Sequence, residues 1–82
     1  MNLNALSKDC GEILRLVCNV YRVNAEAEVS EIQLQKELDL PPSVVRSCLA
    51  RLVSQGLVEA DLLLAHAWVR ATDSGLMTTE RG

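Results

Sequence analysis

The stretch that decides the fold runs from Leu38 to Ala60 and reads LDLPPSVVRSCLARLVSQGLVEA. Proline is well accepted in the first turn of a helix, because the amide hydrogen that it lacks would have no helical partner there and its φ is already helical. We therefore expect a helix to begin near Pro42. Gly56 supplies the left-handed residue at which helices commonly end. The pattern predicts a helix over residues 42–55, whose core-facing residues are Val45, Cys48, Leu49, Leu52 and Val53.

A second, shorter helix is predicted just before this stretch, over residues 30–38. Ser30 is followed three positions later by Gln33, which is the spacing of a capping box at a helix N-terminus. Asp39 then occupies the tight turn between the two helices. Aspartate tolerates a left-handed φ better than most residues, so the turn can be sharp.

The N-terminal part of the chain predicts a long amphipathic helix over residues 4–23. Its apolar stripe is wider than one packing surface needs, and Leu3, Leu16 and Cys18 lie outside the stripe or at its rim. An exposed apolar surface of this kind indicates a partner. We expect a homodimer, although the same surface would serve equally well to dock a different protein.

After Gly56 the hydrophobic period changes from helical to alternating, which is typical of strands. Residues 57–71 are predicted to form a β-hairpin, in whose second strand Trp68 and Arg70 share one face and Val69 occupies the other. Residues 72–75 read as a turn or as the cap of a short final helix, and the tail over 76–82 is expected to fray. Residues 1–82 thus form one domain that is mainly α with a small β-hairpin.

This order of elements resembles a winged helix-turn-helix, and specifically the MarR-like branch of bacterial transcription regulators, over about residues 29–76. Residues 30–35 (SEIQLQ) match the opening of the family's helix before the turn. Residues 40–52 (LPPSVVRSCLARL), followed by GLV at 56–58, align without a gap with its recognition helix. Residues 68–75 (WVRATDSG) match an aromatic residue followed by Thr-x-x-Gly on the returning strand.

The resemblance implies a DNA-binding transcription regulator that acts as a dimer and reads the major groove with the helix over residues 42–55. Within it, Arg46 could bond guanine, Ser43 or Ser47 could bond a phosphate or a base edge, and Arg51 could steady the backbone contact. The candidate DNA-binding residues are Ser43, Val44, Arg46, Ser47, Arg51 and Arg70. This function requires Arg46, Arg51 and Arg70 to form one positive surface.

Composition and charge favour a second function, an acidic winged-helix module for protein–protein interaction, such as a subunit or inhibitor of a larger assembly, that does not bind DNA. The 82 residues carry a formal net charge of −3, whereas phosphate neutralisation by basic residues supplies most non-specific affinity for DNA. The expected wing contains Glu59 and Asp61 and no Lys or Arg between Gly56 and Trp68.

Three consecutive leucines, Leu62, Leu63 and Leu64, complete the expected wing, and they leave two interpretations open. With Trp68 they either pack beneath the third helix as part of the core or form an apolar surface for a protein partner. We favour core packing and keep the three leucines as candidate partner contacts, together with Leu3, Leu16 and Cys18.

Other chemistry is not expected from the sequence. The chain has no catalytic constellation, phosphate-cradling glycine loop or cofactor motif, so we predict neither an enzyme nor a cofactor. Cys10, Cys18, Cys48 and His66 are too scattered for a zinc site. Cys10 and Cys48 are expected in the core and His66 on the hairpin surface. Cys18, at the rim of the first helix, is the one candidate for a reactive or intermolecular thiol. No secretory or membrane-spanning segment is expected, which predicts a cytoplasmic protein.

Overall fold

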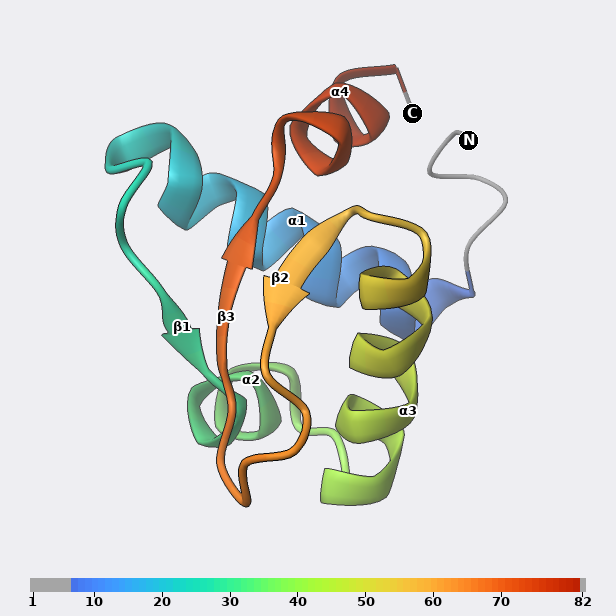
Figure 1. Ribbon diagram of the computed structural model, residues 1–82. Helices are drawn as coiled ribbons and strands as arrows, with labels where there is room; N and C mark the ends of the chain where they lie inside the picture. The colour runs from blue at the N-terminus through green and yellow to red at the C-terminus, as the bar shows by residue number, and fades with distance from the viewer. Residues whose placement is uncertain (1–6, 82) are drawn as a thin grey trace.

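The computed structural model describes residues 7–81, and within this range it contains four helices and one three-stranded antiparallel sheet (Figure 1). The elements in chain order are α1 (Lys8–Val23), β1 (Val29–Ser30), α2 (Glu31–Leu38), α3 (Pro42–Ser54), β2 (Val58–Ala60), β3 (Trp68–Ala71) and α4 (Asp73–Arg81). The strands lie in the order β1-β3-β2. The predicted class, mainly helical with a small β component, is confirmed.

The α3 helix has the bounds that its prolines and glycine predict, to within one residue. Pro42 is its first residue and follows an extended Pro41. At the other end Gly56 has φ 73°, and its amide donates to the Val53 carbonyl at 3.0 Å while the Leu57 amide donates to the Leu52 carbonyl at 2.9 Å. This pair of bonds around a left-handed residue satisfies the last carbonyls of the helix and turns the chain into β2.

The α2 helix is capped as predicted at its start and turned as predicted at its end. The Ser30 hydroxyl accepts a hydrogen bond from the Gln33 amide at 3.1 Å. The reciprocal half of a capping box is absent here, because the Gln33 side chain instead donates to Glu37 at 3.4 Å. Asp39 adopts φ 53° in the turn that leads to α3.

The α1 helix begins at Lys8 rather than at Asn4. Ser7 has an extended backbone and its hydroxyl accepts a bond from the Cys10 amide at 3.3 Å, so Ser7 is the N-cap. The helix contacts α2, α3, β3 and α4, and these contacts within one chain account for the width of its apolar stripe. Figure 1 shows α1 crossing behind the sheet with the other helices arranged around it.

The structure corrects the expected exposure of the candidate contacts on α1. Cys18 is fully buried, at 0% exposure, and is not a rim residue. The position of a residue on one helix does not reveal a neighbour such as α4, which comes from the other end of the chain. Leu16 is half-buried and packs against the core. Leu3 lies outside the described residues.

Two further elements differ from the sequence prediction. The short strand β1 pairs with β3, Val29 opposite Val69 and Ser30 opposite Trp68, so the predicted hairpin is part of a three-stranded sheet. The segment expected to fray is instead the helix α4 up to Arg81. The Thr72 hydroxyl accepts from the Gly75 amide at 3.0 Å and caps this helix.

The core lies between α1, the inner face of the sheet and the two helices α2 and α3. Its fully buried large side chains include Ile13, Leu14, Leu34, Leu49, Leu52 and Val69. No helix within residues 7–81 combines the length and the apolar character needed to cross a membrane.

Candidate functional site

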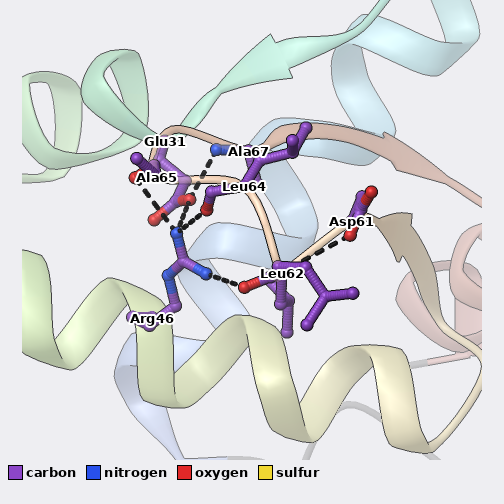
Figure 2. A network of polar contacts seen from close by, with 8 residues as sticks. Glu31, Arg46, Asp61, Leu62, Leu64, Ala65 and Ala67 are labelled. Carbon is purple, nitrogen blue, oxygen red and sulfur yellow. Dashed lines mark hydrogen bonds and ion pairs between the residues drawn. The ribbon is translucent and has the colours of Figure 1, made fainter.

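The Arg46 guanidinium on α3 is the centre of a polar network that holds the loop between β2 and β3, residues 61–67 (the β2–β3 loop) (Figure 2). Its Nη1 donates to the Leu62 carbonyl at 2.5 Å, and its Nη2 donates to the carbonyls of Leu64 at 2.7 Å and Ala65 at 3.2 Å. Three carbonyls of the loop backbone therefore converge on one side chain. A planar guanidinium with five donors in a fixed fork can satisfy such a ring of acceptors.

Glu31, the first residue of α2, completes this network from the other side. Its carboxylate is buried, with 5% of the side chain exposed, and its Oε1 lies 2.6 Å from Arg46 Nη2. The same oxygen accepts from the Ala67 amide at 2.6 Å, while the Glu31 amide donates to the Ala67 carbonyl at 3.0 Å. The buried charge is thus both paired and hydrogen-bonded, as burial of a carboxylate requires.

The network decides how Arg46 is oriented. Because Arg46 bonds Glu31 and three loop carbonyls, its guanidinium is turned toward the β2–β3 loop and only 33% of the side chain is exposed. The donors that would form a bidentate pair with guanine are engaged within the chain. Arg46 in this conformation is a positioning residue for the loop.

The other candidate residues on α3 lie together at a different place. Ser43, Ser47 and Arg51 are exposed, and Val44 is half-buried against the core. These four residues line a surface pocket of about 400 Å³ at the junction of α3 and the start of α1, with Ser7, Asp9, Cys10 and Cys48. Helical spacing brings these four residues of α3 together, and the α1 side of the pocket adds the carboxylate of Asp9.

Arg70 does not join Arg46 and Arg51 in one surface. It projects from the outer face of the sheet, where its Nη2 forms an ion pair with Glu59 at 3.2 Å across the β2–β3 pairing. The positive surface that DNA reading requires is therefore interrupted, because one arginine bonds the loop and another bonds a carboxylate.

Leu63 and Leu64 of the β2–β3 loop and the adjoining Trp68 of β3 are largely exposed, contrary to the expectation of core packing. Leu62 is half-buried against the core, whereas Leu63 is 96% exposed, Leu64 50% and Trp68 55%. Their backbone is nevertheless fixed, since Asp61 Oδ1 accepts from the Leu63 amide at 3.0 Å and Arg46 holds the carbonyls on either side. The loop presents large apolar side chains from a fixed backbone.

Cys10, Cys18 and Cys48 are free thiols and all three are buried. Burial raises the pKa of Cys18, and burial together with a hydrogen bond to Cys10 raises the pKa of Cys48 to about 12. A thiol nucleophile needs the opposite shift. Within residues 7–81 there is no group of three or more His, Cys, Asp and Glu residues suited to a metal ion.

Sequence reasoning missed Glu31 as a member of the site. An acidic residue in the first turn of a helix is explained by the helix dipole alone, and nothing in its spacing from Arg46 indicates a contact. The loop oxygens that accept from Arg46 are backbone atoms. Every residue type carries such an atom, so the sequence does not indicate this contact.

Comparison with known proteins gives no relative for this chain: no family model, no curated protein and no solved structure matches it. The candidate site consists of a clamped loop with an apolar tip, an acidic outer sheet face beside it, and the exposed face of α3.

Proposed function

We propose that this chain is a winged-helix module that recognises a protein partner through the β2–β3 loop. The proposed fold rests on the succession of α2, a left-handed turn at Asp39, α3 and a two-stranded ribbon, and on its likeness to the MarR-like pattern. In this arrangement α2 and α3 are the helix-turn-helix and the β2–β3 loop is the tip of the wing.

The observation that carries the proposed function is the opposite orientation of two side chains. Arg46, the best candidate for reading a base, is turned inward to the loop, while Leu63 at the tip of that loop is 96% exposed. Full burial of a leucine side chain contributes roughly 1.5–3 kcal/mol, so a partner with a matching pocket gains affinity from this residue. A fixed backbone also lowers the ordering cost of binding.

The charges beside the loop support a protein rather than a nucleic acid as the partner. Glu59 and Asp61 are exposed near the apolar tip. A phosphate backbone approaching the loop would meet these carboxylates, and the described loop residues include no Lys or Arg to offset them.

Site-specific photo-crosslinking tests the proposed function. A photoreactive phenylalanine analogue replaces Leu63, and a control chain carries the same group at the exposed Arg15 on α1, in cells that express the chain. We expect one defined protein adduct from position 63 that is absent from position 15. Adding Leu64→Asp should abolish the adduct while the melting temperature is retained.

Two crosslinking results would contradict the proposal. In one, position 63 gives no protein adduct that position 15 lacks. In the other, the adduct survives Leu64→Asp, which would show that the apolar loop is not what the partner contacts.

The exposed face of α3 favours a second candidate function, DNA binding by a dimer. Ser43, Ser47 and Arg51 are exposed on the surface, so a groove can receive this face. One module offers few phosphate contacts, and two linked modules would be needed for useful affinity.

Fluorescence anisotropy with random-sequence duplex DNA tests this second function, at about 50 mM and about 200 mM salt. DNA reading predicts salt-sensitive binding by a dimer, weakened by Arg51→Ala and unchanged by Arg15→Ala, which removes the same charge from the exposed surface of α1. The absence of binding at low salt, or equal loss from both variants, counts against DNA recognition by α3.

A further inference from the structure

A pocket on the outer face of the sheet lies directly beside the β2–β3 loop. It has a volume of about 610 Å³ and is lined by Glu28, Glu59, Ala60, Asp61, Leu64, Trp68 and Arg70. Strand alternation places it there: Val69 points into the core, so its neighbours Trp68 and Arg70 point outward. The pocket therefore combines an indole, a leucine and several charged groups on one solvent-facing surface.

The charge of this pocket is negative, with three carboxylates against one guanidinium. Arg70 pairs with Glu59, but neither Glu28 nor Asp61 forms an ion pair with any side chain of residues 7–80. One oxygen of Asp61 accepts from the Leu63 amide and the other is left for a ligand. The wall of the pocket is Trp68, a large aromatic side chain that is 55% exposed.

We propose that this pocket receives a lysine or arginine side chain of a basic protein segment, whose apolar residues contact Leu63 and Leu64. The proposal rests on the proposed function and names the chemistry of its partner. A cation over the face of an indole is attracted by the ring quadrupole, and unpaired carboxylates at the rim add to this attraction. The long methylene stem of lysine or arginine fits beside Leu64 while its charged end remains at the rim.

Charge complementarity also separates this occupant from other partners. A second copy of this chain has a net charge of −3 and would bring like charge to an acidic pocket. A nucleic acid would bring phosphates to it. Of these three partners, only a basic segment brings the positive charge with which Glu28 and Asp61 can pair.

Trp68 makes the test direct, because it is the only tryptophan in the chain and lies in the pocket. The probe is a short acetylated and amidated peptide that contains lysine, arginine and leucine and no aromatic residue. Its reference has glutamate in place of every basic residue. Titration of the full chain with the basic peptide should change Trp68 fluorescence saturably and weaken with salt, and the acidic peptide should leave the fluorescence unchanged.

Matched double variants show whether the pocket or the overall charge is responsible. Glu28→Gln with Asp61→Asn removes the two unpaired carboxylates, and the new amide group at position 61 keeps an oxygen for the Leu63 amide. We expect the dissociation constant for the basic peptide to rise roughly 3- to 10-fold, since exposed ion pairs and cation–π contacts are individually modest. Glu12→Gln with Glu80→Gln makes the same charge change outside the pocket and should leave the dissociation constant within about 2-fold.

The proposal is overturned if the basic peptide gives no saturable change, if the acidic peptide binds equally, or if both double variants weaken binding alike. Failure here is distinguishable from failure of the proposed function. A defined crosslink at position 63 without basic-peptide binding would show a protein partner that is not basic. Basic-peptide binding without that crosslink would leave the pocket as an independent site.

Discussion

The β2–β3 ribbon is fastened at its two ends in different ways. At the end next to α4, one residue bonds the start of β2 with both its backbone and its side chain: the Thr72 amide donates to the Leu57 carbonyl at 3.2 Å, and the Thr72 hydroxyl donates to the Gly56 carbonyl at 2.6 Å. At the other end, the carbonyls of the β2–β3 loop converge on one side chain, Arg46 of α3. The first end is closed by bonds between the residues that flank the two strands, whereas the second depends on a side chain from another element, α3.

The difference bears on what each end is suited to do. The α4 end is tightly packed, with Leu57 and Gly75 buried, so it holds the sheet and the last helix together. At the loop end hydrogen bonds hold the backbone, while the side chains of Leu63 and Leu64 are exposed. A fixed frame that displays unpartnered side chains is what recognition of another molecule needs.

The largest effect is expected at the packed end, from Gly75→Ala. A Cβ at position 75 would lie 2.1 Å from the carbonyl oxygen of Leu57, a backbone atom that cannot rotate away. We expect the free energy of unfolding to fall by about 3 kcal/mol or more, because α4 must move away from the Leu57 backbone to admit one methyl group. Chemical denaturation followed by circular dichroism measures the change.

The neighbouring substitution Ser74→Ala is the control for this prediction. Ser74 is exposed on the same turn of α4, and its substitution should change stability by no more than about 0.5 kcal/mol. Equal stability of Gly75→Ala and the unaltered chain would mean that α4 does not pack this closely on the Leu57 backbone.

The next effect is expected at the loop end, from Arg46→Ala. The substitution leaves the buried Glu31 carboxylate without its cation and three loop carbonyls without a donor. Loss of one partner of a buried ion pair costs about 3–5 kcal/mol, and partial exposure of Arg46 lowers our expectation to roughly 2 kcal/mol. Thermal and denaturant unfolding measure it.

Lysine at position 46 separates geometry from charge. Arg46→Lys keeps the positive charge but cannot bond several carbonyls at fixed angles, so we expect it to recover less than half of the lost stability. If Arg46→Lys recovered all of the lost stability, the positive charge of Arg46 and not the geometry of its hydrogen bonds would stabilise the loop. Arg51→Ala removes an exposed arginine from the same helix, α3, and should change the free energy of unfolding by no more than about 0.5 kcal/mol.

A smaller loss of stability is expected at the packed end, from a substitution of Thr72. Thr72→Val keeps the shape of the side chain but removes the bond to the Gly56 carbonyl and the cap on the Gly75 amide. We expect a loss of about 1–2 kcal/mol, and Thr72→Ser, which keeps the hydroxyl, should recover most of it. If valine and serine were equally stable, the two hydrogen bonds would contribute nothing to the junction.

A contrast between local and distant contacts explains how much of the molecule the sequence could predict. The start of α3 at Pro42, its end at Gly56 and the left-handed turn at Asp39 follow from backbone preferences of single residues, and all three were predictable. The cap of α2 at Ser30 follows from local spacing in the same way. Such features need no knowledge of where distant parts of the chain lie.

What could not be predicted depends on contacts between distant residues. Cys18 is buried although its helix position predicts a rim residue, because Thr79 of α4 lies beside it, and β1 has too few residues to show alternation. In the candidate site, the helix face of Ser43 and Ser47 was predictable from helical spacing. The inward turn of Arg46 was not, because its acceptors are backbone carbonyls and a glutamate 15 positions away.

The smallest effect on stability is expected at the tip of the loop, and it is the most informative for function. Leu63 is 96% exposed, so Leu63→Ser should change the free energy of unfolding by less than about 0.5 kcal/mol in denaturant melts. Leu57→Ala at the buried end of the ribbon should cost about 2–4 kcal/mol. A large loss from Leu63→Ser would mean that the tip packs within the chain. With stability unchanged, any loss of partner binding by Leu63→Ser comes from the surface that the loop displays, because the fold that displays it is intact.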